Sequence, residues 1–198
     1  MQEINKNLLQ YLNWLWENTF ISNCVNIFVD APIFIIPVFL LWMWIYYSFS
    51  KTEKNVLEKK QKLIYIFYGI VFSLIISLII QQFIQVDRPE EHLKAWAKLL
   101  LDHLPDASFP SDHATVSIAF LAGLFFSWYK KYFWIFLLPI VFMDISRIIA
   151  WVHWPFDIIA GSIVWIIGSY ISINYLSKIK LVKKLNMEII KLLNYIKL

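Results

Sequence analysis

Ser-Arg-Ile-Ile-Ala-Trp-Val-His-Trp-Pro-Phe-Asp, residues 146–157, lies between two long apolar stretches and carries three ionisable side chains, Arg147, His153 and Asp157. An ionisable group at the end of a membrane span is costly, so it indicates a functional site or a pairing within a helix bundle. The stretch therefore predicts the place where one membrane helix ends at a polar site and the next begins.

The composition is typical of an integral membrane protein. Of the 198 residues, 60% are hydrophobic and 18% are aromatic, and the mean hydropathy is +0.60, far from the mixture found in soluble domains. The single cysteine, Cys24, excludes an intrachain disulfide. The first residues show no cleavage pattern of a signal peptide, so the spans themselves are expected to direct insertion.

The pattern of apolar stretches predicts an all-α, polytopic bundle that forms one domain over residues 1–198. A helix of about 20 residues crosses the roughly 30 Å hydrocarbon core of a bilayer. The five expected spans cover about 28–49, 63–86, 111–128, 133–149 and 157–175.

Amphipathic segments accompany these spans. Residues 1–20 and 90–103 are each expected to contain a helix at the bilayer surface, and 51–62 is expected to be a solvated loop. The tail, 178–198, alternates lysines with Ile and Leu, which predicts a basic interfacial helix attracted to anionic lipid. Because lipid explains this basic tail, no nucleic-acid partner is expected.

The distribution of charge predicts the topology. Residues 51–62, the Lys130-Lys131 turn and the tail hold thirteen of the eighteen basic residues, whereas 87–112 holds three basic against six acidic residues. The positive-inside rule places the first group in the cytoplasm. With five spans, the N-terminus and the polar stretch 146–157 then lie on the extracytoplasmic side.

The polar residues expected on that side suit phosphate chemistry. Arg88 and Arg147 carry planar, permanently charged forks that match phosphate oxygens. A helix beginning at residues 110–113 directs its free N–H groups towards an anion. His113 and His153 can divide the roles of proton donor and nucleophile between them. A carboxylate near an imidazole, as Asp157 is expected to be, fixes the tautomer of the ring.

Pro155 predicts the local geometry around His153. A proline disfavours helical geometry in the preceding residue, here Trp154, and is tolerated at the first position of a helix. His153 is therefore expected on the loop before the fifth span, with Asp157 in or near the first helical turn.

Other polar residues of the expected spans are interpreted as structural. Asp144, three residues before Arg147, is expected to pair with it inside the bundle, and a structural role is favoured for Ser146. Asp30 lies near the outer end of the first span.

Taken together, these motifs resemble the type 2 phosphatidic acid phosphatase superfamily, membrane lipid phosphatases that share a site with vanadium haloperoxidases. The signature of that family reads Lys-x6-Arg-Pro, Pro-Ser-Gly-His and Ser-Arg-x5-His-x3-Asp. The third part matches at Ser146, Arg147, His153 and Asp157, the second at Pro110, Ser111 and His113, and the first at Arg88-Pro89. The resemblance covers residues 81–157.

The resemblance implies roles for these residues. His153 would be the nucleophile that forms a phosphohistidine, Asp157 would orient it, and His113 would be the general acid. The residues implied to hold the phosphoryl oxygens are Arg88, Arg147 and Ser111. No metal or other cofactor is expected, because the arginines and the helix end supply the positive charge that Mg2+ supplies in kinases.

Two positions depart from the signature. Gln81 stands in place of its lysine and Asp112 in place of its glycine, and these two residues, with Ser146, are possible further members of the site. The wording Ser-Phe-Pro-Ser-Asp-His at 108–113 is similar to the bacitracin-resistance branch of undecaprenyl-pyrophosphate phosphatases. The resemblance therefore implies undecaprenyl pyrophosphate as the substrate and a bacterial inner membrane as the location, with lipid A 1-phosphatase or phosphatidylglycerophosphate phosphatase as alternatives.

Two other classes remain open at this point. A small transporter or a structural membrane subunit would share the apolar composition, although transporters usually show repeats and broken helices near the midplane. A phosphatase fold without activity is the second alternative, and Gln81 is the residue that argues for it. Release of inorganic phosphate from a lipid phosphate without added metal would distinguish the enzyme from both.

Overall fold

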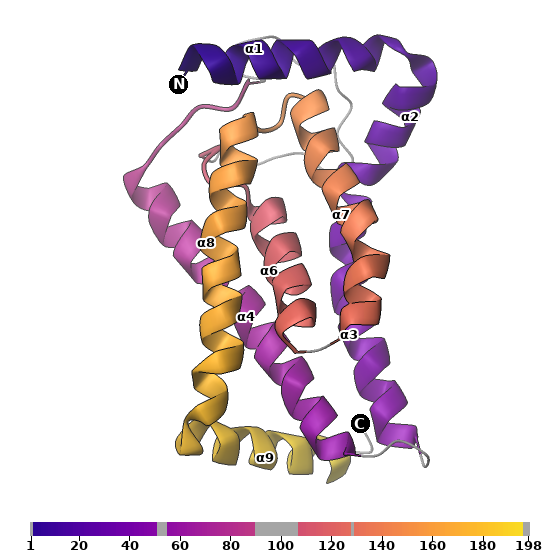
Figure 1. The fold of residues 1–198 in the computed structure, drawn as a ribbon, viewed down its shortest axis with the longest axis vertical. Coiled ribbons are helices and arrows are strands. Elements are labelled where there is room, and N and C mark those ends of the chain that lie inside the picture. Colours follow the sequence, from indigo (N-terminus) through magenta and orange to yellow (C-terminus); the bar gives the residue numbers. More distant parts are fainter. Residues whose placement is uncertain (1, 51–54, 90–106, 128, 196–198) are drawn as a thin grey trace.

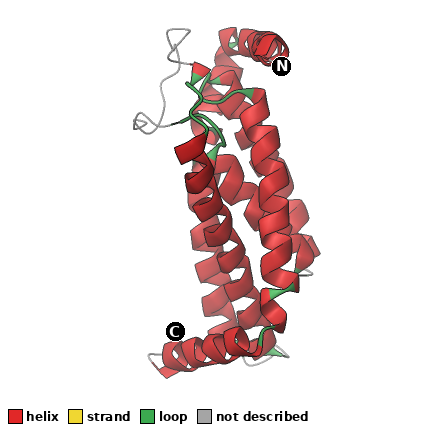
Figure 2. Cartoon of the chain, turned by 90° about the vertical axis from the view of Figure 1, so that its left-hand side faces the viewer, coloured by secondary structure: helices red, strands yellow, loops and turns green. Residues whose placement is uncertain are grey.

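The structure is a computed structural model that describes residues 2–50, 55–89, 107–127 and 129–195, and its regular elements there are all helical (Figures 1 and 2). The expected all-α bundle is thus confirmed. The elements are α1 (Gln2–Asn13), η1 (Trp14–Glu17), α2 (Thr19–Phe28), α3 (Ala31–Phe49), α4 (Val56–Phe83), α6 (Asp112–Phe126), α7 (Lys130–Ile149), α8 (Pro155–Asn174), η2 (Leu176–Lys178) and α9 (Lys180–Tyr195).

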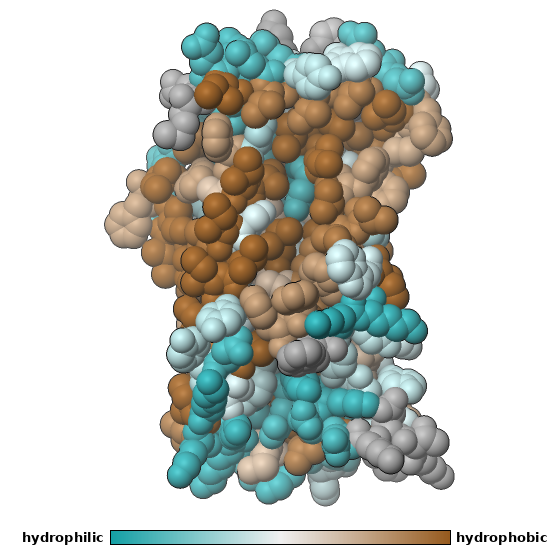
Figure 3. Space-filling model, viewed as in Figure 1, coloured by the Kyte–Doolittle hydropathy of each residue, from teal (hydrophilic) through white to brown (hydrophobic). Residues whose placement is uncertain are grey.

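Four helical stretches are long and apolar enough to cross a membrane, namely Thr19–Phe49, Val56–Phe83, Lys130–Ile149 and Pro155–Lys178. The expectation of about five spans corresponds to these four and to α6, an apolar helix of only 15 residues. Figure 3 shows the result, a broad apolar band between two hydrophilic ends. The chain is a multi-pass membrane protein.

The short helix α6 occupies the centre of the bundle, where it packs against α4, α7 and α8 (Figure 1). Ala119, Phe120 and Leu124 of α6 are fully buried and belong to the main hydrophobic core. Most of the surface of α6 therefore contacts neighbouring helices, whereas Phe125 near its end is exposed. Its N-terminus begins deeper in the bundle than the adjoining ends of α7 and α8.

The first membrane stretch is broken into two helices at Val29 and Asp30. Asn18 caps α2 by accepting from the N–H groups of Phe20 and Ile21, and α3 begins after Asp30 with Pro32 in its first turn. A proline at that position starts a helix instead of kinking one. The break therefore places the Asp30 carboxylate at a turn between two helices.

The two terminal helices lie across opposite ends of the bundle, α1 at one end and α9 at the other (Figures 1 and 2). Tyr68 donates to Asn186 at 2.7 Å, which ties α9 to α4. This arrangement agrees with the expectation of interfacial helices, and their place at a membrane surface stays a prediction. The expected surface helix 90–103 lies outside the described residues.

The expectation of a loop over 51–62 is wrong from residue 56 onward, because α4 begins at Val56. Glu58 and Lys62 form an i,i+4 ion pair of 2.7 Å, which favours the helix. Lys60 is 1% exposed, lies over the ring of Trp44 at 4.6 Å, and donates to Asn194 at 2.6 Å. Packing of this lysine therefore extends the helix into the charged segment.

Candidate functional site

The turn after α7 positions His153. The N–H of Val152 donates to the carbonyl of Arg147 at 3.0 Å, and that of Trp151 donates to Ile148 at 3.1 Å, the bond pattern of a Schellman motif. Trp151 has φ 61° at the position that glycine usually takes, a conformation that costs about 1–2 kcal/mol in other residues. The helix thus ends sharply and the chain turns back towards the bundle.

The start of α8 fixes the other side of the same loop. Trp154 is extended, with φ −73° and ψ 149°, and Pro155 opens the helix. Oδ2 of Asp157 accepts from the N–H of Trp154 at 2.9 Å. The prediction that His153 lies on the loop and Asp157 in the first turn is confirmed.

His153 is buried, and its hydrogen bonds define its tautomer. Nδ1 lies 2.9 Å from the backbone carbonyl oxygen of Ser108. Because a carbonyl oxygen only accepts, Nδ1 carries the proton, and in the neutral ring Nε2 keeps a lone pair. Nε2 lies 3.4 Å from Nη2 of Arg147, so this lone pair faces a guanidinium.

Asp157 is connected to His153 through Ser108. The carboxylate oxygen Oδ2 lies 3.6 Å from Nδ1 of His153, beyond hydrogen-bond distance. The Ser108 hydroxyl donates to this oxygen at 2.5 Å and lies 3.4 Å from Nδ1. Sequence reasoning missed Ser108, although it opens the Ser-Phe-Pro-Ser-Asp-His string that carried the resemblance.

The charge state of His153 follows from its surroundings. Burial lowers the pKa of His153 well below its ordinary value of 6.5, and the positive charges of Arg147, Arg88 and His113 lower it further. The hydrogen bond to Ser108 acts in the opposite direction with a smaller effect. The imidazole is therefore neutral at pH 7, which is the form that has a lone pair.

Arg147 pairs with Asp30, and the expected pairing with Asp144 is wrong. Nη1 of Arg147 lies 2.6 Å from Oδ1 of Asp30 and 3.1 Å from the carbonyl oxygen of Val29. Asp144 is buried, and its Oδ1 has no hydrogen-bond partner among the described residues. The turn between α2 and α3 carries Asp30 to the guanidinium, and this long-range partner prevails over the neighbour on α7.

His113, in the first turn of α6, approaches the same carboxylate. Its Nε2 lies 3.1 Å from Oδ1 of Asp30, and the His113 side chain is 19% exposed. One carboxylate oxygen thus lies within ion-pair distance of both His113 and Arg147. Sequence reasoning placed Asp30 at the end of a span and did not include it in the site.

Two more members of the signature, Ser111 and Arg88, adjoin the polar cluster. That cluster is formed by Asp30, His113, Arg147, His153 and Asp157. Ser111 is the N-cap of α6, and its Oγ accepts from the N–H of Ala114 at 3.4 Å. Arg88 is 5% exposed, and its Nη1 donates to the carbonyl of Val152 at 3.3 Å. Arg88 thereby joins the segment that follows α4 to the loop that carries His153.

The two departures from the signature contact each other. Gln81 Nε2 donates to Oδ1 of Asp112 at 3.0 Å and to the carbonyl of Pro110 at 3.2 Å. The Ser77 hydroxyl donates to the same Asp112 oxygen at 2.7 Å. The carboxylate of Asp112 is therefore held against α4 by two neutral donors. Ser146 donates to the carbonyl of Phe142 on its own helix at 2.7 Å, a structural bond.

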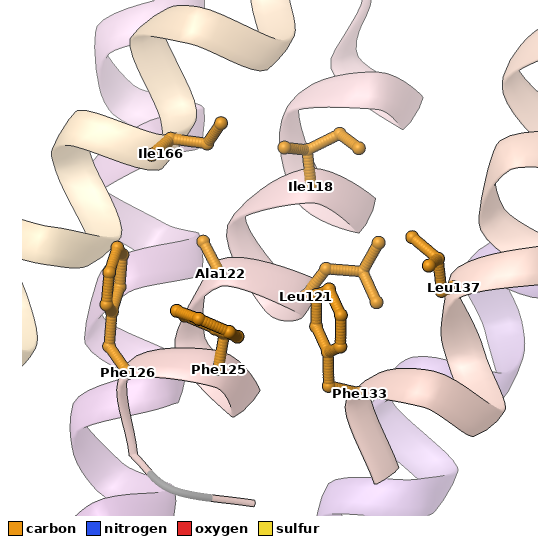
Figure 4. Close-up of a pocket in the computed structure, with 8 residues that line it drawn as sticks. All are labelled: Ile118, Leu121, Ala122, Phe125, Phe126, Phe133, Leu137 and Ile166. Carbon is orange, nitrogen blue, oxygen red and sulfur yellow. The ribbon is translucent and has the colours of Figure 1, made fainter. Parts of the chain in front are cut away.

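An apolar pocket of about 370 Å³ lies apart from this cluster, between α6, α7 and α8 (Figure 4). It adjoins the C-terminal half of α6, whereas His113 is at the N-terminal end. Its lining is Ile118, Leu121, Ala122, Phe125, Phe126, Phe133, Leu137 and Ile166. The polar cluster is therefore a separate feature of the fold.

Comparison with known proteins gives this cluster a context. The bacitracin transport permease protein BcrC of Bacillus licheniformis is 29% identical over 170 residues, which cover 84% of this chain and 78% of that protein. The undecaprenyl-diphosphatase BcrC of Bacillus subtilis is 24% identical over 169 residues, 85% of this chain and 82% of that protein. The fold is similar to the crystal structure of Aquifex aeolicus LpxE, with a TM-score of 0.65 and 20% identity over 87% of this chain and 96% of that one.

The family model of the PAP2 superfamily matches residues 62–180. This range covers more than half of the chain and includes Arg88, His113, Arg147, His153 and Asp157. The chain therefore belongs to the PAP2 superfamily and is a hydrolase of the phosphatase type.

Proposed function

We propose that the protein removes the terminal phosphate of undecaprenyl pyrophosphate at the extracytoplasmic surface of a bacterial inner membrane, through a phosphohistidine on His153. The names of relatives such as the undecaprenyl-diphosphatase of Bacillus subtilis support this substrate. The charge distribution along the sequence supports the side of the membrane.

The single observation that carries the mechanism is the hydrogen bond from His153 Nδ1 to the Ser108 carbonyl, 2.9 Å long. This bond leaves the lone pair on Nε2, beside the guanidinium of Arg147. A phosphoryl group bound by Arg147 would therefore meet a nucleophile that is already oriented. Activation by a fixed tautomer and a lowered pKa is the usual requirement for covalent catalysis.

In the first step, Nε2 of His153 attacks the terminal phosphorus, and the bond from phosphorus to the bridging oxygen breaks. His113 donates its proton to that oxygen, so that undecaprenyl phosphate leaves and the phosphoryl group stays on His153. Arg88 and Arg147 balance the charge of the transferred phosphoryl oxygens. The phosphorylated ring is cationic, and Asp157 stabilises it through Ser108.

In the second step, water attacks the phosphorus of the phosphohistidine. His113, now neutral, takes a proton from the water, and the bond between phosphorus and Nε2 breaks. Inorganic phosphate leaves, His153 regains its lone pair, and His113 is again protonated. This sequence requires one histidine to begin neutral and the other to begin charged, a common division in acid and base catalysis.

The substrate is tested with a panel of lipids. Purified protein in detergent, with EDTA present, is given undecaprenyl pyrophosphate, lipid A or phosphatidylglycerophosphate, and inorganic phosphate is measured. We expect the highest kcat/KM with undecaprenyl pyrophosphate, without added metal. A preference for another lipid would replace the substrate and keep the mechanism. Absence of release from all three would contradict the proposed substrate and both of its alternatives.

The side of the membrane is tested with single cysteines. In a Cys24→Ser background, Glu3→Cys on α1 and Lys184→Cys on α9 each introduce a thiol at an exposed position. A membrane-impermeant maleimide applied outside intact cells should label the thiol on α1 and leave that on α9 unlabelled until the cells are broken. The reverse pattern would place the catalytic end in the cytoplasm.

A further inference from the structure

Asp30 is a buried carboxylate that the proposed mechanism does not use. It is 0% exposed and lies outside residues 62–180, the part of the chain that matches the family model. It occupies the N-cap of α3, yet its side chain makes no capping hydrogen bond there. A local structural role, which is the common reason for an aspartate at this position, therefore does not account for its orientation.

The Asp30 carboxylate points towards two residues of the polar cluster, Arg147 and His113. Oδ1 lies 2.6 Å from Nη1 of Arg147 and 3.1 Å from Nε2 of His113. Oδ2 has no hydrogen-bond partner among the described residues. A buried anion is costly unless it is paired, so Arg147, and His113 when it is protonated, hold Asp30 in place.

We propose that Asp30 is a positioning residue of the phosphatase site, which keeps His113 in its protonated form. This inference rests on the proposed function, because it concerns the proton that His113 gives to the leaving oxygen. An opposite charge within about 4–6 Å favours the charged form of a titratable group and changes its pKa by about 1–3. A nearby carboxylate therefore raises the pKa of a histidine. Asp30 thus prepares the acid, while His153 is kept neutral by burial.

The same carboxylate has a second consequence for substrate binding. A negative charge 2.6 Å from Nη1 of Arg147 opposes the approach of an anion to that guanidinium. Asp30 therefore favours the protonated acid and disfavours phosphate binding at the same time. Neutralising it should lower kcat without raising KM, whereas a loosened site would raise KM.

Asp30→Asn tests this inference because it removes the charge and keeps the shape. We expect kcat to fall at least about tenfold, and the alkaline limb of the pH profile to move to lower pH by about one unit or more. The KM should stay the same or fall. An alkaline limb at the wild-type pH, or a fall in kcat accompanied by a higher KM, would overturn the proposal.

Three further variants define the cause. Asp144→Asn removes another buried carboxylate, on the helix that carries Arg147, and should leave the alkaline limb in place. Asp30→Glu keeps the charge and should restore the limb towards the wild-type pH. Asp30→Ser removes the charge but leaves a favourable N-cap residue, so it replaces Asp30→Asn if that variant does not fold.

A readout that does not depend on turnover separates this inference from the proposed function. The four histidines are labelled with carbon-13, and the signal of His113 is assigned by its loss in His113→Gln. The midpoint of the His113 titration should fall in Asp30→Asn and not in Asp144→Asn. If wild-type protein releases no phosphate but this shift is present, the substrate proposal fails and the role of Asp30 stands. An unchanged midpoint overturns the role of Asp30.

Discussion

The two histidines of the site occupy opposite electrostatic surroundings. His153 is 1% exposed, donates from Nδ1 to a backbone carbonyl and faces Arg147 with Nε2. His113 keeps partial contact with solvent, and its Nε2 lies 3.1 Å from the Asp30 carboxylate. Burial beside positive charge favours the neutral ring, and a neighbouring carboxylate favours the cation. The two environments therefore support the different tasks that the proposed mechanism gives to two residues of one type.

The largest effect is expected from removing the neutral histidine. His153→Ala should lower kcat by about 10⁴- to 10⁶-fold, as for the loss of other covalent nucleophiles. The measurement is phosphate release, together with detection of labelled phosphohistidine after alkaline quenching. Ser146→Ala, whose hydroxyl contacts only its own helix in the described structure, should retain activity and labelling. Normal turnover in His153→Ala would remove the covalent mechanism.

Replacing His113, the proposed general acid, should lower kcat less, and the loss should depend on the leaving group. His113→Gln is expected to lower kcat by about 10²- to 10⁴-fold with a lipid phosphate, the usual range for general acid catalysis. A substrate with a p-nitrophenyl leaving group needs no proton to depart, so the burst of its release should be slowed much less. Equal losses with both substrates would mean that His113 is not the acid.

Removing the Ser108 hydroxyl, which links His153 to Asp157, should lower kcat less than either histidine substitution. Ser108→Ala removes the hydroxyl that donates to Asp157 and keeps the backbone carbonyl that fixes the tautomer. A hydrogen bond to a charged group contributes about 1.5–3 kcal/mol, so kcat should fall by about 10- to 150-fold with KM little changed. Ser117→Ala, which removes a buried hydroxyl bonded within α6, is the control. The bridge has no catalytic role if both variants behave alike.

The smallest effect is a shift along the pH axis. Burial and the charges of Arg147, Arg88 and His113 lower the pKa of His153 well below 6.5. A base with a lowered pKa stays neutral down to that lower pH, so the acid limb of kcat/KM should lie below pH 6.5 after correction for ionisation of the substrate. Arg88→Gln removes one positive charge and should move this limb to higher pH. An acid limb at or above pH 6.5 in the wild-type protein would contradict the lowered pKa of His153.

Local patterns in the sequence predicted the parts of the site that local geometry determines. Pro155 sets the extended backbone of Trp154 and the start of α8, and both follow from residues within a few positions. The expected pairing of Asp144 with Arg147 was wrong for the converse reason. Arg147 pairs instead with Asp30, which lies 117 positions away in the sequence. Spacing within one helix carries no information about such a partner.

The missed residues illustrate what a motif leaves out. Asp30 is an acidic residue inside an apolar span, which is itself an indication of function. The sequence does not indicate which residues form ion pairs with it. Gln81 and Asp112 were each recognised as departures, whereas their mutual hydrogen bond needed the packing of α4 against α6. The main core sets the packing of α4 against α6, and a second cluster packs α2 against α7. No short pattern encodes either arrangement.

The shortness of α6 connects the site to the mechanics of the bilayer. Its 15 residues extend about 22 Å at 1.5 Å per residue, less than the roughly 30 Å of hydrocarbon that a full span crosses. Since α6 begins below the ends of α7 and α8, a lipid phosphate bound as proposed would have to descend from the headgroup layer to reach His113. Hydrophobic mismatch between protein and lipid costs a fraction of a kcal/mol per Å. On the proposed function, a thinner membrane would shorten that descent, and we expect the acyl-chain length of the host lipids to affect the rate of catalysis.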